Sequence, residues 1–290
     1  MPLAFTPLHP LFVAEASGVE LRSCHDPEAL AAIRRGMDEY AVLVFRDQHL
    51  SHEEQLGFTE RFDGRIHRTT SASVVAKNRH GDEALTDISN VGDDNQVMAA
   101  GDRRRMNNLA NRLWHTDASF VDPCGRYSLL AARVVPPEGA DTEYADMRAA
   151  YDTLAPDLRR RVEGQRALHS IVHSRGTLGF EFSEAERQRL PGAVQPLVRT
   201  IPGSGRKALY LASHASHLVD WPVPESRLLL MELMEHATRP QFVYRHKWRA
   251  GDVVIWDNRC TMHRGTRFED TTHRRELVRT TTLDVPLATA

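Results

Sequence analysis

The spacing of apolar residues along the first part of the chain predicts helices alternating with buried strands. Residues 26–40 place apolar side chains at helical spacing, after Asp26, which can cap the helix, and Pro27, which suits its first turn. Residues 41–45 form a short apolar run that is typical of a buried strand. Residues 51–62 open with Ser-His-Glu-Glu, the pattern of a capping box, and predict a second helix.

Further along the chain, strand patterns outnumber helical ones. Strands are expected at residues 127–135, 142–147, 198–201, 208–211, 242–248, 253–256 and 277–285. Helices are expected at residues 148–154, 156–168 and 224–238. The chain has no repeated βαβ unit, internal repeat or linker. We therefore expect a mainly β fold with peripheral helices, forming one domain over residues 1–290.

Residues 64–108 are polar and irregular, with one apolar island at 88–91. Loops this long in a compact domain are usually functional or disordered. The segment leads directly into the candidate metal site described below, so we predict a lid over that site. A surface insertion without a catalytic role is the alternative.

Composition narrows the class of protein. The 290 residues carry a net charge of −2, with 41% hydrophobic and 26% charged residues, as in ordinary globular proteins, and nothing suggests a nucleic-acid partner. Three widely spaced cysteines predict no disulfide framework. No signal-peptide pattern opens the sequence and no stretch approaches ~20 apolar residues, so we expect no membrane association and a cytoplasmic location.

Candidate chemistry centres on His115 and Asp117, with His263 far downstream. Two histidines and one carboxylate are the ligands of mononuclear non-haem Fe(II) sites, where they leave the other metal positions open. Residues i and i+2 of a strand point to the same side, so His115 and Asp117 can face one ion if they lie on a strand. His-x-Asp alone is a weak signal in a chain with 15 histidines.

Two arginines follow the second histidine. The stretch 275–283 also reads as a strand, so Arg275 and Arg279, four residues apart, project to one face. A guanidinium group matches a carboxylate with two parallel hydrogen bonds. Two such cations beside a metal predict anionic ligands.

Segments spread over nearly the whole chain carry a resemblance to a known family. They include Asp87-Ile-Ser-Asn-Val91, Leu113-Trp-His-Thr-Asp117, Asp141-Thr-Glu143, His214-Ala-Ser-His217 and Trp256-Asp-Asn-Arg259. In these the chain resembles the taurine and 2,4-dichlorophenoxyacetate dioxygenases, and more closely the 2,4-dichlorophenoxyacetate branch.

The resemblance implies a double-stranded β-helix, or jelly roll, holding Fe(II), with 2-oxoglutarate and O₂ as co-substrates and ascorbate helpful in assays. It implies that His115, Asp117 and His263 bind the metal, and that Arg275 and Thr142 hold 2-oxoglutarate. The segment between His263 and the arginines is one residue longer than expected. Arg274 is therefore an alternative to Arg275, although the four-residue step to Arg279 favours Arg275.

The substrate is expected to be a small anion bound by Arg279, with Asn111, Asn90 and His217 around it. Turn or capping roles are the alternatives for the asparagines, and a structural role or a second metal site for His214 and His217. Likeness to the family also suggests a homo-oligomer.

The expected reaction is hydroxylation of an aryloxyalkanoate, such as 2,4-dichlorophenoxyacetate, next to the ether oxygen. Its products would be a phenol, a 2-oxo acid such as glyoxylate, succinate and CO₂. Asp117 favours hydroxylation, because related halogenating enzymes lack this carboxylate. One alternative is a dioxygenase for taurine, another alkylsulfonate or an alkyl sulfate. An alternative of another class is a non-catalytic, metal-binding jelly-roll sensor.

Overall fold

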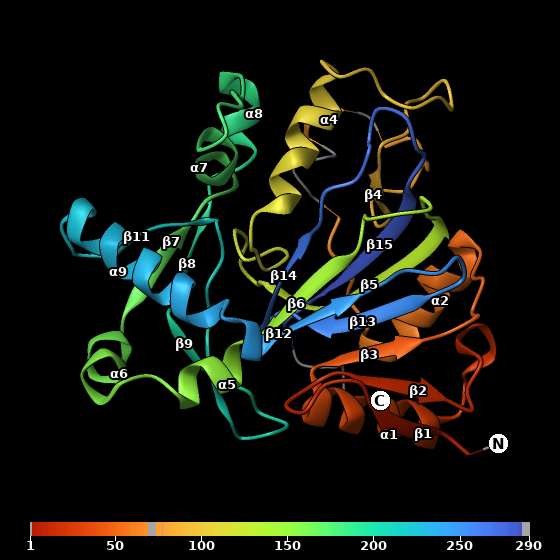
Figure 1. Cartoon of the computed structure of the whole chain (residues 1–290), viewed down its shortest axis with the longest axis horizontal. Coiled ribbons are helices and arrows are strands. Elements are labelled where there is room, and N and C mark those ends of the chain that lie inside the picture. Colours follow the sequence, from red (N-terminus) through yellow and green to blue (C-terminus); the bar gives the residue numbers. More distant parts are fainter. Residues whose placement is uncertain (1, 69–73, 77, 286–290) are drawn as a thin grey trace.

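A seven-stranded sheet forms the largest layer of the protein (Figure 1). The computed structural model describes residues 2–68, 74–76 and 78–285. The order in the sheet is β1 (Ala4–Pro7), β2 (Ala14–Ser17), β3 (Val42–Phe45), β13 (Val253–Asp257), β5 (Gly125–Val134), β15 (Glu276–Leu283) and β4 (Thr86–Ser89). Its pairs are antiparallel except for β2 with β3.

A smaller sheet packs against one face of the large one. It contains β12 (Val243–His246), β6 (Thr142–Asp146) and β14 (Thr261–Gly265), all paired antiparallel. Val42 and Val44 of β3 share a buried cluster with Tyr144 of the small sheet. Leu43 and Phe45, which alternate with them, belong to a cluster on the other face. The strand sequence therefore supplies two apolar surfaces, as its unbroken hydrophobic run requires.

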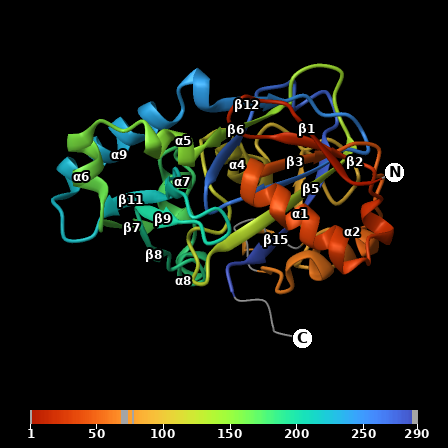
Figure 2. The same ribbon diagram turned by 90° about the horizontal axis from the view of Figure 1, so that it is seen from below.

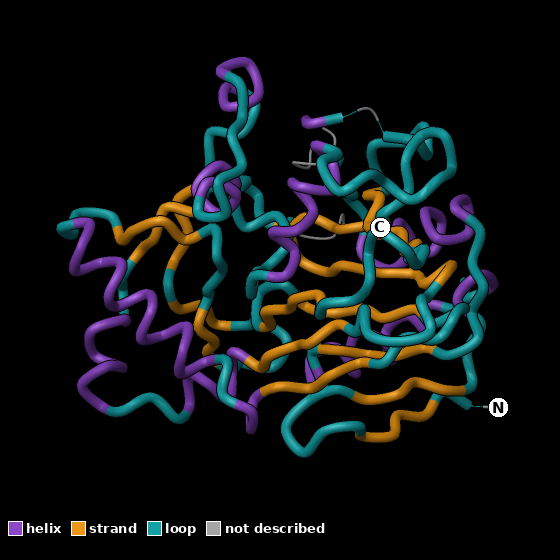
Figure 3. Tube along the Cα trace, turned by 45° about the horizontal axis from the view of Figure 1, so that its top comes forward, coloured by secondary structure: helices purple, strands orange, loops and turns teal. Residues whose placement is uncertain are grey.

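Helices α1 (Pro27–Tyr40) and α2 (His52–Asp63) cover that other face, as Figure 2 shows. Asp26 caps α1 through the amide of Glu28, and Ser51 and Glu54 form the capping box of α2. In Figure 3 the strands run side by side across the centre of the molecule and the helices lie at the periphery.

A second group of elements lies beside the two sheets (Figure 1). Its strands are β7 (Arg166–His169), β8 (Ala193–Pro196), β9 (Val198–Thr200), β10 (Lys207–Leu209) and β11 (Ala215–Leu218). Its helices are α5 (Met147–Asp152), α6 (Pro156–Val162), α7 (Ile171–Gly176), α8 (Glu184–Gln188) and α9 (Val223–Ala237). One apolar cluster joins this group to the small sheet through Ala145 and Met262.

Three sequence-based expectations need correction. The helix expected at 156–168 ends at Val162, because Gly164 has a φ of +73°, and residues from Arg166 on form β7 between β8 and β11. His115 and Asp117 do not share a strand, since only His115 makes an isolated bridge and Asp117 lies in a turn. The segment 64–108 contains β4 and helix α4 (Arg103–Asn108), while its residues 69–73 and 77 lie outside the described residues.

Two further expectations concern cysteines and membranes. All three cysteines, Cys24, Cys124 and Cys260, are buried and free, as their spacing predicted. Among the helices of the described residues, none combines the length and the apolar character that crossing a bilayer requires.

Candidate metal centre and its two cavities

Main-chain pairing places His115 beside His263. The amide of each residue donates to the carbonyl of the other, at 3.0 and 2.8 Å, in an isolated antiparallel bridge. Opposed residues on paired strands lie close together, so the two imidazole centroids are 4.2 Å apart. A bridge between the segment that follows η2 (Leu109–Arg112) and β14 therefore positions His115, in place of the strand that it was expected to share with Asp117.

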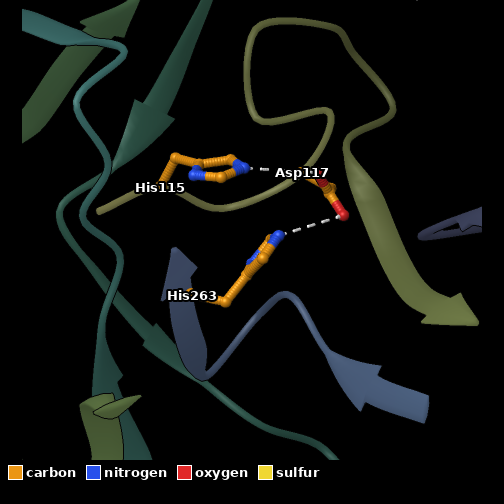
Figure 4. Close-up of side chains that lie close together, drawn as sticks. All are labelled: His115, Asp117 and His263. Atoms are coloured by element: carbon orange, nitrogen blue, oxygen red, sulfur yellow. Dashed lines mark ion pairs between the residues drawn. The ribbon is translucent and has the colours of Figure 1, made fainter. Parts of the chain in front are cut away.

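Asp117 completes a cluster of three donors (Figure 4). Its Oδ1 lies 3.9 Å from Nε2 of His115, and its Oδ2 lies 3.7 Å from Nε2 of His263. All three side chains are buried, and their donor atoms lie within 4.8 Å of one another. These separations are too long for hydrogen bonds, but a single ion with bonds of roughly 2.1 Å can reach all three donors with small movements.

The tautomer of His115 suits a metal ligand. Nδ1 of His115 donates to the carbonyl of Leu113 at 2.8 Å, so Nε2 keeps its lone pair toward the cluster. A ring N–H bound to a carbonyl is the usual way in which a metal-binding histidine is oriented. Nε2 of His263 also faces Asp117.

Asp117 is held by groups that the sequence did not single out. Its Oδ2 accepts from Ser128 Oγ at 2.7 Å, and its amide donates to Asn258 Oδ1 at 3.1 Å. Asn258 also donates from Nδ2 to Ser128 Oγ at 2.9 Å, which links both residues to the carboxylate. The only indication of this role in the sequence is that Ser128 is a polar residue within the buried run of β5.

Arg279 contacts Asp117 directly, by donating from Nη1 to Oδ1. Burial raises the pKa of the Asp117 carboxyl, but Arg279, the two histidines and the hydrogen bond from Ser128 together outweigh this, and the pKa falls to about 2. Burial lowers the pKa of His115 to about 4 and that of His263 well below its usual value. At neutral pH the cluster therefore has one carboxylate and two neutral imidazoles, the protonation state that metal binding needs.

A cavity of about 820 Å³, including its opening to solvent, borders His115 and His263 on one side of the cluster. Thr142 and Arg275 line it. Arg275 is 9% exposed, and among the described residues its guanidinium donates only to the carbonyls of Ala140 and Ile88, both at 3.3 Å. Within the described residues it forms no ion pair, and burial lowers its pKa to about 10, so it carries a positive charge at neutral pH.

Arg274 lies outside this cavity. Its Nη2 is 2.7 Å from the carboxylate of Glu276 and also donates to Asn95. The side chain that faces the cavity is therefore Arg275, the residue that the four-residue step to Arg279 favoured.

A second cavity of about 450 Å³, with its opening included, borders His115 and Asp117. Arg175 and His214 line only this cavity, whereas Arg279 and Asn111 line both. Burial, with a contribution from Arg279, lowers the pKa of Arg175 to about 9, so this guanidinium is also protonated at neutral pH. The cluster therefore opens on two cavities that each contain a buried arginine of their own.

Asn90 borders the first cavity, but its side-chain amide bonds to the main chain. Nδ2 donates to the carbonyls of Asp270 and His273 at 2.7 and 2.8 Å, and Oδ1 accepts from the amide of Arg275 at 2.8 Å. In this structure Asn90 therefore positions the loop before Arg275.

His217 lines neither of these cavities. It lies on β11 with Nδ1 2.9 Å from Ser216 Oγ. His214, three residues earlier, is 1% exposed and borders the second cavity. The sequence His-Ala-Ser-His does not distinguish its two histidines. In the structure His214 lies in the turn before β11 and His217 lies on the strand, so their surroundings differ.

Comparisons with known proteins identify the family. The family described as taurine catabolism dioxygenase TauD, TfdA matches residues 4–281. An alpha-ketoglutarate-dependent 2,4-dichlorophenoxyacetate dioxygenase of Cupriavidus pinatubonensis (strain JMP 134 / LMG 1197) is 49% identical over 98% of this chain and 99% of its own. One of the same description from Burkholderia sp. (strain RASC) is 48% identical over 95% and 93%.

A solved structure is also similar over its full length. It is described as AAD-2 in complex with Mn(II) and N-oxalylglycine, and it shares 42% identity with a TM-score of 0.90 and complete coverage of both chains. The chain therefore belongs to the TauD/TfdA dioxygenase family.

Proposed function

We propose that this protein is an Fe(II)- and 2-oxoglutarate-dependent dioxygenase that hydroxylates an aryloxyalkanoate next to its ether oxygen. The observation that carries the proposal is the cluster of His115, Asp117 and His263, which borders two cavities with a buried arginine in each. Two histidines and one carboxylate leave metal positions open, and each cavity can deliver one anionic reactant to them.

The first cavity suits 2-oxoglutarate. Arg275 is a buried cation without a carboxylate partner among the described residues, and Thr142 offers a hydroxyl in the same cavity. Arg275 would hold the distal carboxylate of the co-substrate, so that the keto acid end is directed toward the histidines.

Bound Fe(II) supplies the redox chemistry through which O₂ converts 2-oxoglutarate to succinate and CO₂ and hydroxylates the second substrate. The side chains of the site bind the reactants, orient them and exclude water. Ser128 donates to the carboxylate of Asp117, and Asn258 accepts from its main-chain amide. Arg279, which borders both cavities, donates to the same carboxylate. An aryloxyacetate hydroxylated at the carbon between the ether oxygen and the carboxylate forms a hemiacetal, which collapses to a phenol and glyoxylate.

The choice of an aryloxyalkanoate is supported by the relative at 49% identity, which is described as acting on 2,4-dichlorophenoxyacetate. Arg279 is our candidate for contacting the substrate anion, because it borders both cavities. Asn111, which also borders both, is a further candidate. An arginine binds a sulfonate as well as a carboxylate, so the substrate class needs a direct test.

We also propose that the facing sheets form a double-stranded β-helix and that residues 1–290 act as one domain. Residues Ile88, Asn90 and Arg105, from the segment 64–108, border the first cavity, which supports a lid role for this segment. Three free cysteines and a need for Fe(II) support a reducing, cytoplasmic location. A homo-oligomer remains an expectation from the family.

A substrate panel tests the function. Purified protein with Fe(II), 2-oxoglutarate and ascorbate is supplied with 2,4-dichlorophenoxyacetate, taurine or an alkyl sulfate in parallel. We expect phenol and succinate only with the aryloxyacetate. Sulfite release from taurine, or aldehyde and sulfate from the alkyl sulfate, would move the enzyme to the rival substrate class. Metal binding without succinate from any of the three would favour the sensor.

A further inference from the structure

Arg175 is a buried cation that has no assigned role in the proposed reaction. It lies on α7 and is 4% exposed. A buried charge is strongly unfavourable unless a partner of opposite charge compensates it. Within the described residues, no carboxylate forms an ion pair with Arg175, and its polar contacts are all to neutral groups.

The other buried arginines show how unusual this is. Four arginines are buried in the part of the chain that the structure describes: Arg148, Arg175, Arg259 and Arg275. Arg148 pairs with Asp146 at 3.0 Å, and Arg259 pairs with Asp257 at 2.7 Å. Arg175 and Arg275 form no such pair, and these two are the ones that border the cavities. The reason that assigns 2-oxoglutarate to Arg275 therefore predicts a second anion at Arg175.

Three neutral side chains hold Arg175. Nη1 donates to Ser174 Oγ at 3.1 Å and to His214 Nε2 at 3.3 Å, and Nη2 donates to Asn111 Oδ1 at 3.2 Å. A guanidinium group has five N–H donors. Among the described residues, the buried Nε–H has no hydrogen-bond partner and one N–H of Nη2 is uncommitted. Nε and Nη2 are neighbouring nitrogens, and two neighbouring N–H donors are what a carboxylate binds.

The contact with His214 also fixes the direction of a hydrogen-bond chain. Arginine only donates, so Nε2 of His214 must accept, and its proton lies on Nδ1. Nδ1 then donates to Ser119 Oγ at 3.0 Å, and Ser119 donates to Nδ1 of His169 at 3.0 Å. The chain thus holds the arginine through a neutral imidazole, which leaves the positive charge available to a ligand.

The position of Arg175 suits one reactant of the proposed reaction. In an aryloxyalkanoate, the carbon to be oxidised is bonded directly to the carboxylate carbon. The carboxylate must therefore lie within a few bond lengths of the open metal positions. The second cavity meets this requirement, because His115 and Asp117 line it together with Arg175 and Arg279. Arg279 already donates to Asp117, whereas Arg175, which Asp117 attracts only at longer range, forms no ion pair with a carboxylate of the described residues.

We propose that Arg175, held by Asn111 and His214, binds the carboxylate of the aryloxyalkanoate in the second cavity, with Arg279 beside it. The proposal rests on the proposed function and assigns the two anions to separate arginines, with 2-oxoglutarate at Arg275 and the substrate at Arg175.

The test compares Arg175→Gln with Arg189→Gln, which replaces an exposed arginine after α8 in the same part of the chain. Calorimetry would measure binding of 2,4-dichlorophenoxyacetate and of its neutral amide to protein loaded with Mn(II) and N-oxalylglycine, so that no turnover occurs. Saturation curves with Fe(II) would give the KM for 2-oxoglutarate and for the acid. Arg175→Lys, which keeps the charge, guards against simple misfolding.

We expect Arg175→Gln to weaken binding of the acid by roughly tenfold or more, while binding of the amide and the KM for 2-oxoglutarate change little. Arg175→Lys should retain part of the lost affinity, and Arg189→Gln should match the wild type. Unchanged acid binding in Arg175→Gln, or an equal loss of acid and amide, would overturn the proposal. If the wild type neither binds nor converts the acid, the proposed function itself fails and the assignment of Arg175 falls with it.

Discussion

Replacing Arg275 by glutamine should separate co-substrate binding from folding. Within the described part of the chain, the Arg275 guanidinium makes only two hydrogen bonds, of 3.3 Å each, to main-chain carbonyls. Asp141 attracts this charge at longer range, but no carboxylate of the described residues forms an ion pair with it, so the main consequence of losing it should fall on an anionic ligand. A hydrogen bond to a charged group contributes about 1.5–3 kcal/mol, which corresponds to roughly 10- to 150-fold in affinity. We therefore expect the KM for 2-oxoglutarate to rise by that factor in Arg275→Gln.

Arg274→Gln is the matched control, because Arg274 is adjacent in sequence but pairs with Glu276 outside the cavity. It should leave the KM for 2-oxoglutarate within about twofold of the wild type, as surface substitutions usually do. The assay is succinate release over a range of 2-oxoglutarate concentrations at saturating 2,4-dichlorophenoxyacetate, with thermal unfolding of each variant as a check on folding. The reasoning is refuted if Arg274→Gln reproduces the effect, or if Arg275→Gln binds 2-oxoglutarate normally.

Three further predictions concern the metal cluster. Asp117→Ala should abolish turnover and lower the bound iron per chain, measured by metal analysis, whereas full activity in this variant would remove Asp117 from the ligand set. Ser128→Ala, which deletes the 2.7 Å hydrogen bond to Asp117, should weaken Mn(II) binding roughly tenfold as measured by titration, and unchanged binding would show that Ser128 does not orient the carboxylate. Mn(II) affinity should be nearly constant from about pH 6 to 8, because the pKa of His115 is lowered to about 4 and its imidazole has lost its proton well below this range, whereas an affinity that falls steadily as the pH drops from 8 to 6 would contradict that shift.

The elements with the clearest local signals were the ones that sequence patterns predicted. Asp26 and Ser51 cap α1 and α2, and the apolar run at 41–45 contains β3. The helix expected at 156–168 shows the limit of such patterns. Its last part has ordinary helical residues, but pairing with β8 and β11 makes Arg166–His169 a strand. That pairing joins segments distant in sequence, so local spacing could not reveal it.

The candidate site shows the same division. His115, Asp117 and His263 were selected by residue type and spacing, and the structure brings them together. The expectation that His115 and Asp117 lie on one strand was wrong. A bridge orients His115, and a turn orients Asp117.

Arg175 was not selected at all, since nothing in the sequence around it distinguishes an unpaired buried arginine from a surface one. Only the fold shows that it is buried and forms no ion pair with a carboxylate of the described residues, although Asp117 lines the same cavity. His217 was chosen over His214 for a similar reason, because burial and cavity position depend on the turn before β11.

The central claim is that oxidation of an aryloxyalkanoate is coupled to oxidation of 2-oxoglutarate at this metal cluster. The most direct test is the stoichiometry of products from purified protein supplied with Fe(II), O₂, 2-oxoglutarate and 2,4-dichlorophenoxyacetate. The account predicts that 2,4-dichlorophenol, glyoxylate and succinate appear in equal amounts, and that omitting either O₂ or 2-oxoglutarate stops phenol release. Phenol formed without 2-oxoglutarate, or succinate formed with no phenol at any substrate concentration, would contradict it.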